Sequence, residues 1–234
     1  MIKTCIILAG GLGTRLSSVL RGKPKCLAPV GEKSFIEIQL NALKNKGIAS
    51  FILSLGHKSE MVTAQIHLLG DQFDIQVIVE DSPLGTGGAI LNAMSFFNLE
   101  ETLVSNGDTY LNGNIESIFP ILNLDGCPPE LGRIAITPVL NTLRYGEVVF
   151  QEGVIKGFLE KNQEGPGLIN AGLYHLHRKP FESYLSGEAF SLEHDILPKM
   201  VREGLLRGVV INGDFIDIGV PDDYFKFCEI QKSL

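Results

Sequence analysis

Cysteine is scarce in this chain of 234 residues. Its four cysteines lie far apart, and none has the Cys-x-x-Cys spacing that is typical of a zinc site. They are too few for the dense disulfide framework of a small secreted protein, so we expect reduced thiols, as in the cytosol. These residues are Cys5, Cys26, Cys127 and Cys228.

Positive charge is also in deficit. The chain has 20 lysines and arginines against 27 aspartates and glutamates, which gives a formal net charge of −7. Because a nucleic acid binds a basic face, we expect no nucleic-acid partner. A small polyanionic ligand remains compatible with this composition, since local cations and Mg²⁺ can reverse the sign of the potential inside a cleft.

Long apolar runs are missing as well. The N-terminal run from Thr4 to Ala9 ends at glycines and is too short for a signal-peptide core followed by a cleavage site. No stretch reaches the roughly 18 apolar residues that a membrane helix needs. We therefore expect a cytoplasmic protein without a membrane partner.

Glycine, in contrast, is concentrated where the first predicted strand ends. Residues 8–16 read Leu-Ala-Gly-Gly-Leu-Gly-Thr-Arg-Leu, and Pro24-Lys25 follows. A glycine turn after a buried strand presents backbone N–H groups to phosphate oxygens, with no Cβ atom in the way. Arg15 and Lys25 add two mobile cations, which suit a triphosphate whose charge builds up during bond exchange. This segment predicts that the chain binds a nucleotide phosphate and breaks a bond in it.

Two better-known glycine motifs do not fit. Leu16 occupies the place of the third glycine in the dinucleotide-binding motif G-x-G-x-x-G, which disfavours NAD, FAD and an oxidoreductase function. Gly22-Lys23 is followed by Pro24 where the phosphate loop of ATPases has Ser or Thr, so that motif fails too.

Strand-like and helix-like segments alternate through the first half of the chain, which predicts a parallel sheet with helical crossovers. Ser34 and Glu37 form a capping box that begins one helix, Gly47 stops it, and Ser59 begins the next. Ligands bind beyond the carboxyl ends of parallel strands, so the glycine segment, Glu80 and Asp108 should gather at one edge. The predicted strands are 4–9, 51–55, 75–79 and 102–105, and a further helix is predicted over 88–97.

After residue 110 the predicted strands have little helix between them, which indicates a mixed or antiparallel sheet. They cover 133–139, 147–150, 154–159 and 168–176, with two more near Val209 and Phe215. Ser191 should cap a helix, and a last helix should begin near Pro221. The predicted fold class is α/β, a Rossmann-like, mostly parallel mixed sheet flanked by helices.

A set of short segments spread along the chain forms a recognisable pattern. Residues 10–16, Pro24-Lys25 and Pro29 are followed by residues 83–88, 107–108, 160–161, 170–172 and 217–219. In residue type and spacing the chain resembles the sugar-1-phosphate nucleotidylyltransferases, or NDP-sugar pyrophosphorylases, over nearly its whole length. Within that family it is most similar to the short guanylyltransferases that act on D-glycero-D-manno-heptose 1-phosphate or mannose 1-phosphate.

The resemblance implies a glycosyltransferase-A-like nucleotidyltransferase fold. Residues 1–234 would form a single nucleotidylyltransferase domain, with a nucleotide-binding half over 1–110 and a sugar-phosphate-binding half over 111–234. Longer members of the family carry a C-terminal β-helix domain, which we do not expect here. The implied enzyme transfers a nucleoside monophosphate from an NTP, GTP in the first place, to a sugar 1-phosphate. The products are an NDP-sugar for surface polysaccharide synthesis and pyrophosphate, and the implied cofactor is Mg²⁺.

The resemblance also implies roles for individual residues. Arg15 should hold the leaving phosphates, Lys25 the α-phosphate, and Asp108 and Asp217 the metal, with Arg15, Lys25 and Asp108 counted as catalytic. The implied nucleotide-binding residues are Leu8, Ala9, Gly10, Gly11, Gly13, Thr14, Glu80, Pro83, Gly85, Thr86, Asn106 and Gly107. The implied sugar-phosphate-binding residues are Tyr145, Gly146, Glu160, Lys161 and Asn170.

Glu80 bears on the choice of base. By resemblance it stands where uridylyl- and thymidylyltransferases usually carry Gln. A carboxylate only accepts hydrogen bonds, and guanine presents N1–H and its N2 amino group side by side as donors. Cytosine would instead set an acceptor against Glu80, and uracil offers one donor between two carbonyls, so the residue favours GTP.

Alternatives remain open. One is a uridylyl- or thymidylyltransferase acting on another hexose 1-phosphate. Another is a non-catalytic regulatory homologue that senses nucleotide sugars; it should have lost Arg15, Lys25 or a metal aspartate, all of which are present. The residues do not decide between a monomer and a homodimer.

Two further pairs of residues are expected to have structural roles. His175 and His177 lack a third ligand that would make them a metal site. Glu193 and Asp195 are expected to favour a helix N-terminus electrostatically.

Overall fold

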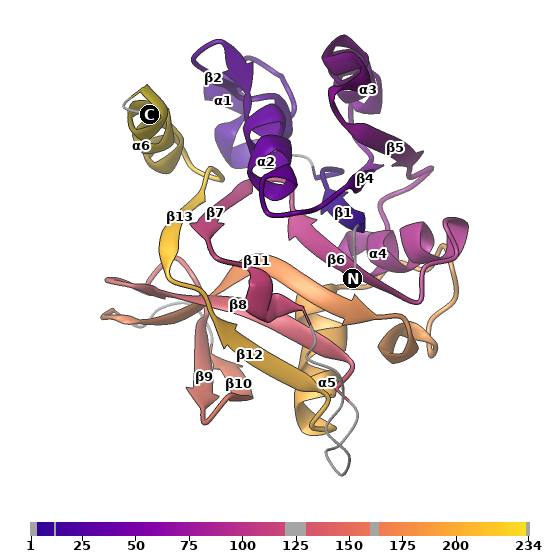
Figure 1. Cartoon of the computed structure of the whole chain (residues 1–234), viewed down its shortest axis with the longest axis vertical. Helices are drawn as coiled ribbons and strands as arrows, with labels where there is room; N and C mark the ends of the chain where they lie inside the picture. Colours follow the sequence, from indigo (N-terminus) through magenta and orange to yellow (C-terminus); the bar gives the residue numbers. More distant parts are fainter. Residues whose placement is uncertain (1–3, 12, 120–129, 160–163, 233–234) are drawn as a thin grey trace. The chain divides into compact units, whose positions relative to one another are not determined.

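The computed structural model describes residues 4–11, 13–119, 130–159 and 164–232. The chain forms two compact units (Figure 1). The N-terminal unit consists of residues 3–83, 105–112 and 214–234, and the central unit of residues 1–2, 84–104 and 113–213. The expectation of one domain with functional halves on either side of residue 110 stays a prediction.

Parallel strands form the sheet of the N-terminal unit, in the order β5-β4-β1. The apolar run in β1 is buried on both faces, which is why it has no polar alternation. The strands are β1 (Thr4–Leu8), β4 (Ser50–Leu55) and β5 (Asp74–Val79), and the helices between them are α2 (Phe35–Lys44) and α3 (Ser59–Leu69). These strands and helices confirm the predicted alternation.

Short elements complete this unit. Strand β7 (Thr109–Gly113) pairs with β13 (Gly213–Asp217), and β2 (Pro29–Val30) pairs with β3 (Lys33–Ser34). None of β2, β3 and β7 was predicted: β2 and β3 have only two residues each, too few for a period-2 pattern, and β7 begins directly after the Gly107-Asp108 turn. The remaining elements are the 3₁₀ helices η1 (Thr14–Leu16), η2 (Lys25–Leu27) and η3 (Gly70–Gln72), helix α1 (Ser17–Leu20) and helix α6 (Pro221–Lys232).

The capping box predicted at the start of α2 is wrong in its hydrogen bond. Ser34 does occupy the N-cap position, with φ −88° and ψ 156°, but its hydroxyl makes no capping bond. That hydroxyl is buried without a hydrogen-bond partner among the described residues. The extended backbone at Ser34 is instead fixed by pairing with Pro29 in the β2–β3 hairpin. The helix ends at Lys44, and Gly47, with φ +90°, follows it as expected.

Helix α6 anchors the chain that follows the glycine segment. Phe227 lies edge-on to Phe35 at a ring distance of 5.3 Å, and the hydroxyl of Tyr224 donates to the Pro29 carbonyl at 2.5 Å. Leu16, which rules out the dinucleotide motif, is fully buried in this same cluster. Residues 16–35 therefore depend on the C-terminus of the chain for their packing.

The central unit contains a mixed sheet in the order β6-β11-β8-β12-β10-β9 (Figure 1). Strand β8 pairs antiparallel with β11 and parallel with β12, while β10 pairs antiparallel with β9 and β12. This confirms the predicted change of pattern and the mixed α/β fold class. The strands are β6 (Glu101–Asn106), β8 (Gly132–Val139), β9 (Glu147–Gln151), β10 (Val154–Leu159), β11 (Gly167–His177) and β12 (Leu206–Val210).

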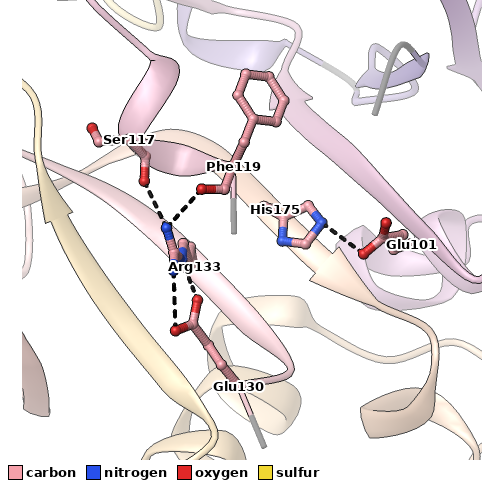
Figure 2. Close-up of polar contacts among 6 residues, drawn as sticks. All are labelled: Glu101, Ser117, Phe119, Glu130, Arg133 and His175. Carbon is pink, nitrogen blue, oxygen red and sulfur yellow. Dashed lines mark hydrogen bonds and ion pairs between the residues drawn. The ribbon is translucent and has the colours of Figure 1, made fainter. Parts of the chain in front are cut away.

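A row of titratable and charged side chains crosses this sheet (Figure 2). His175 on β11 stands opposite Arg133 on β8, and its Nε2 lies 3.3 Å from Oε2 of Glu101. Arg133 contacts the carboxylate of Glu130 and donates to two backbone carbonyls. Burial lowers the pKa of His175 against the opposing effect of Glu101, so its imidazole is neutral at pH 7. The contacts fit the structural role expected of His175.

Helix α4 (Gly85–Phe96) begins three residues earlier than the predicted 88–97, because its glycines pack against a distant segment. The carbonyl of Phe190 accepts from the N–H groups of Gly87 and Gly88 at 3.0 and 3.2 Å. A Cβ atom at Gly85 would lie 2.5 Å from that carbonyl oxygen, and one at Gly88 would collide with the carbonyl of Glu188. These contacts explain the run of glycines structurally.

The helix predicted at Ser191 is confirmed. The Ser191 hydroxyl accepts from the His194 N–H at 3.1 Å. The first turn after it, Leu192–Ile196, is wound as a π-helix and continues into α5 (Leu197–Arg202). Within the described residues, no helix is both long and apolar enough to cross a membrane.

We expect Gly88→Ala to destabilise the protein. In an unhindered helix this change stabilises by roughly 1 kcal/mol, but here overpacking against a backbone carbonyl should cost about 1–3 kcal/mol. Thermal unfolding should show a Tm lowered by several degrees, while Asn92→Ala on the same helix should leave the Tm unchanged or raise it. An unchanged Tm in Gly88→Ala would mean that residues 188–190 do not press on this helix.

Candidate active site

The end of β1 is crowded by backbone from two neighbouring segments. A Cβ atom at Gly10 would lie 3.1 Å from the Gly56 nitrogen and 3.3 Å from Oε1 of Glu80. A Cβ atom at Gly107 would lie 2.5 Å from the Leu8 carbonyl oxygen, which accepts the Gly107 N–H at 2.9 Å. The structure thus brings the glycine segment, Glu80 and Gly107 together at the carboxyl edge of the parallel strands.

Gly13 lies against the side chain of Lys25. Gly13 has left-handed backbone angles, φ 61° and ψ 30°, and a Cβ atom there would lie 3.0 Å from Cγ of Lys25. Any larger residue would be strained and would displace the lysine. Arg15 follows on η1 and is exposed to solvent. Leu12 lies outside the described residues.

Lys25 and Asp108 form an ion pair. Nζ of Lys25 lies 2.8 Å from Oδ2 of Asp108, with side chains 17% and 31% exposed. Cys26, the next residue, is buried, and burial raises the pKa of its thiol to about 12. It is therefore a core residue rather than a reactive thiol.

Asp217 lies next to the Asp108 segment. The Ile218 N–H donates to the Asp108 carbonyl at 3.0 Å, and the Gly219 N–H donates to Oδ1 of Asp217 at 2.7 Å. No cluster of three or more His, Cys, Asp or Glu ligands occurs among the described residues. Two carboxylates fit Mg²⁺, which takes oxygen ligands and completes its shell with phosphate oxygens and water.

Glu80 is held at the end of β5 by contacts with β4. Its N–H donates to the Leu55 carbonyl at 2.8 Å, and its Oε1 lies 3.4 Å from the hydroxyl of the buried Ser54. The carboxylate is half-buried and lies beside Gly10. Ser54 was not recognised from the sequence, since a serine inside an apolar strand has no distinguishing signal.

Thr86 makes its hydrogen bonds inside the central unit. Its hydroxyl donates to Oε2 of Glu193 at 2.6 Å and accepts the Leu192 N–H at 2.9 Å. Glu193, expected only to favour a helix N-terminus, also accepts a hydrogen bond from Ser191 at 3.1 Å. Nothing local in the sequence marks this contact, because the two residues lie far apart in the chain.

The predicted sugar-site residues that the structure describes belong to the central unit. Asn170 bridges a bulge in β11: its Nδ2 donates to the Tyr174 hydroxyl at 2.7 Å, and its Oδ1 accepts the Gly172 N–H at 2.9 Å. A Cβ atom at Gly146 would lie 2.8 Å from the Leu159 carbonyl oxygen. The guanidinium of Arg144 lies over the Tyr145 ring, 5.1 Å from the ring centroid. Glu160 and Lys161 lie outside the described residues.

Lys58 is a cation that the sequence did not single out. It follows β4 with left-handed backbone angles, φ 60° and ψ 34°, and its Nζ donates to the Gly22 carbonyl at 2.5 Å. It thereby fastens the segment between Arg15 and Lys25. Its place in the short connection between β4 and α3, after the carboxyl end of a parallel strand, was the available signal.

Comparison with known proteins agrees with this geometry. A family model described as nucleotidyl transferase matches residues 4–232. D-glycero-alpha-D-manno-heptose 1-phosphate guanylyltransferase of Aneurinibacillus thermoaerophilus is 36% identical over 98% of this chain and 97% of its own length. Mannose-1-phosphate guanylyltransferase catalytic subunit beta of Drosophila pseudoobscura pseudoobscura is 30% identical over 98% of this chain and 62% of its own length.

A solved structure is similar as well. HddC from Yersinia pseudotuberculosis complexed with GMP-PN has a TM-score of 0.84 and 35% identity, covering 98% of this chain and all of that one. The resemblance predicted from the glycine segment and its companions is confirmed. With the family model matched along nearly the whole chain, this protein belongs to the nucleotidyl transferase family.

Proposed function

We propose that this protein is a sugar-1-phosphate guanylyltransferase. It transfers GMP from GTP to D-glycero-D-manno-heptose 1-phosphate, forming a GDP-sugar for surface polysaccharide synthesis and pyrophosphate. The observation that carries the assignment is the placement of Glu80 beside Gly10, at the same edge as the Lys25–Asp108 pair. Full-length relatives at 35–36% identity include a heptose 1-phosphate guanylyltransferase and a protein solved with a guanine nucleotide, which supports it.

The reaction requires charge neutralisation more than proton transfer. An oxygen of the sugar phosphate forms a bond to the α-phosphorus of GTP, and the bond from that phosphorus to the bridging oxygen breaks to release pyrophosphate. The nucleophile is already ionised, so no strong general base is needed. Lys25, held against Gly13, stabilises charge on the α-phosphate, and the solvent-exposed Arg15 holds the β- and γ-phosphates.

Asp108 and Asp217 are the proposed holders of Mg²⁺. The metal, when bound, neutralises phosphate charge and orients the α-phosphate. The protein's part is to present the two carboxylates from neighbouring segments, joined by the hydrogen bond between Ile218 and the Asp108 carbonyl.

The sugar site is proposed to use Tyr145, Gly146, Glu160, Lys161 and Asn170. Mannose 1-phosphate is the second candidate substrate, because the Drosophila mannose-1-phosphate guanylyltransferase is 30% identical across almost all of this chain.

Gly85 and Thr86 remain proposed nucleotide contacts in addition to their packing role. The proposed location is the cytoplasm, which agrees with free thiols at Cys5, Cys26 and Cys228.

The two cations should act on turnover rather than on folding. We expect Arg15→Ala and Lys25→Ala each to lower kcat by about 10²-fold or more, since each removes charge stabilisation of the transition state. The Asp108 side chain keeps contact with solvent when Lys25 is removed, so the change in Tm should be small compared with the loss of turnover. Lys33→Ala, an exposed lysine of the same unit, is the control. Near-normal turnover in either variant would remove that residue from the mechanism.

Activity should depend on a divalent metal through the two aspartates. EDTA should abolish pyrophosphate release and Mg²⁺ restore it, because the phosphates need a counter-charge that Lys25 and Arg15 alone do not supply. Asp108→Asn and Asp217→Asn should each require far more Mg²⁺, whereas Asp214→Asn, an exposed aspartate on the same strand as Asp217, should respond like the wild type. Wild-type metal dependence in the first two variants would identify those carboxylates as turn residues.

Base selection by Glu80 is the decisive test of the guanylyl assignment. Glu80→Gln replaces an acceptor by a donor opposite the N1–H and N2 edge of guanine, and a mispaired buried group costs about 1–3 kcal/mol. GTP use should therefore fall roughly 10- to 100-fold, while UTP or dTTP use should improve. The measurement is kcat/KM for GTP, UTP, dTTP and CTP with heptose and mannose 1-phosphates. Asp81→Asn, which removes the neighbouring exposed charge, is the control.

A wild-type preference for UTP or CTP would contradict the guanylyl assignment. An unchanged preference in Glu80→Gln would place base recognition elsewhere. In either case the protein would remain a nucleotidylyltransferase of another base specificity, which is the uridylyl or thymidylyl alternative. Absence of pyrophosphate release with all four nucleotides would favour the non-catalytic regulatory homologue.

A further inference from the structure

Gln39 is a buried polar residue on the otherwise apolar inner face of α2. Its side chain is 3% exposed. Its Nε2 lies 2.7 Å from the Asn106 carbonyl oxygen, 3.0 Å from the Thr109 carbonyl oxygen and 3.0 Å from the Ser105 hydroxyl. The amide therefore spans the turn between β6 and β7, and that turn consists of Gly107 and Asp108.

The orientation of this amide is fixed by chemistry. The backbone carbonyls of Asn106 and Thr109 only accept hydrogen bonds, so the group that faces them has to be the donor nitrogen. The Ser105 hydroxyl can serve both as the third acceptor and as a donor to the Asn106 carbonyl, at 3.4 Å. The NH₂ group has two N–H bonds, so one of them is shared between two of the three acceptors, and a leucine or methionine side chain would donate to none of them.

The glutamine is not there for packing. Its Oε1 is buried and has no hydrogen-bond partner among the described residues. A buried acceptor without a partner is destabilising, and an apolar side chain of the same size would avoid that loss. The cost of the unpaired Oε1 is therefore accepted together with the hydrogen bonds of Nε2, and those bonds hold the turn that contains Asp108.

We infer that Gln39 is a positioning residue that fixes the Asp108 carboxylate for the metal. Its role rests on the proposed function, in which Asp108 binds Mg²⁺. Nε2 of Gln39 holds the residues on both sides of the Gly107-Asp108 turn, and the Ile218 N–H holds the Asp108 carbonyl itself. With its backbone fixed on these sides, only the Asp108 side chain is left to turn from Lys25 toward a cation.

Fixing the backbone in advance favours metal binding. A carboxylate on a mobile turn loses conformational freedom when it coordinates an ion, whereas one on a fixed turn has lost that freedom already on folding. Removal of groups that orient a metal ligand typically weakens metal affinity or activity by about 10- to 100-fold. Gln39 holds that place in this site without touching the substrate.

Gln39→Met tests the role, because it keeps the length of the side chain and removes both polar atoms. We expect the Mg²⁺ concentration that half-saturates pyrophosphate release to rise about tenfold or more, with the kcat at saturating Mg²⁺ reduced much less. Gln39→Glu should raise the half-saturating Mg²⁺ concentration at least as much, since a carboxylate would repel the two carbonyls. Asn41→Leu removes an amide on the same helix that donates to the Glu37 carbonyl at 2.8 Å, and should leave the Mg²⁺ dependence unchanged.

A readout without turnover separates positioning from general damage. The Mn²⁺ EPR spectrum of the enzyme with GTP and no sugar phosphate should differ from the wild type in Gln39→Met and match it in Asn41→Leu. If Gln39→Met shows no cooperative unfolding transition, Ser105→Ala takes its place. It removes one of the three acceptors and should raise the half-saturating Mg²⁺ concentration by a few fold.

The outcomes distinguish the two levels of the hypothesis. If Asp108→Asn loses its Mg²⁺ response while folded Gln39→Met keeps the wild-type Mg²⁺ dependence and EPR spectrum, Gln39 is a packing residue and this role is wrong. An unchanged dependence in Ser105→Ala has the same meaning where that variant is used. If Asp108→Asn itself keeps the wild-type Mg²⁺ response, the proposed metal site fails, and the role of Gln39 fails with it.

Discussion

The close approach of backbone to backbone at the end of β1 is the constraint on which the candidate site depends. A Cβ atom at Gly107 would collide with the Leu8 carbonyl and one at Gly56 with the Gly10 carbonyl, while a Cβ atom at Gly10 would be tightly packed against Gly56 and Glu80. Three segments far apart in the sequence can meet there only because glycine is present on both sides. Their meeting leaves backbone N–H groups and two acidic side chains, Glu80 and Asp108, at one edge of the parallel strands.

Electrostatics then determines what such an edge binds. The chain as a whole is acidic, with a net charge of −7. The glycine segment nevertheless contains the cation Arg15, and Lys25 follows it in the chain. Lys25 is paired with Asp108 and lies against Gly13, so its ammonium has a defined place without a ligand. Asp108 and Asp217 suit a metal that neutralises the same phosphates. Opposite charges are thus interleaved over a short distance, which suits a ligand that carries its own cation.

Much of the fold could be predicted because its signals are local. Strand–helix alternation gave the parallel strands of the N-terminal unit, and its loss after residue 110 gave the mixed sheet of the central unit. Glycine spacing around Arg15 and Lys25 was enough to identify the family. The errors also have local causes: the Ser34 capping bond is replaced by hairpin pairing with Pro29, and α4 starts early because its glycines pack against Phe190.

The parts that escaped prediction are contacts between residues far apart in the chain. Gln39 with the β6–β7 turn, Thr86 with Glu193 and Lys58 with Gly22 each join segments that have no shared periodicity. The sequence does not distinguish a buried glutamine from any other polar residue on a helix, since only the fold shows which carbonyls accept its hydrogen bonds. Residues that support a site are therefore harder to recognise than residues that line it.

The construction of the N-terminal unit also has a consequence for the order of events during synthesis. Its segment 3–83 carries Arg15 and Lys25, while helix α6, which packs on Phe35 and Pro29, is synthesised only after residues 113–213 of the central unit. Most of the central unit, residues 84–104 and 113–213, lies between them in the chain and can fold before α6 is made. A nascent chain therefore carries the segment with Arg15 and Lys25 without its hydrophobic support until α6 has been synthesised, so the unit in which the candidate site lies is completed late.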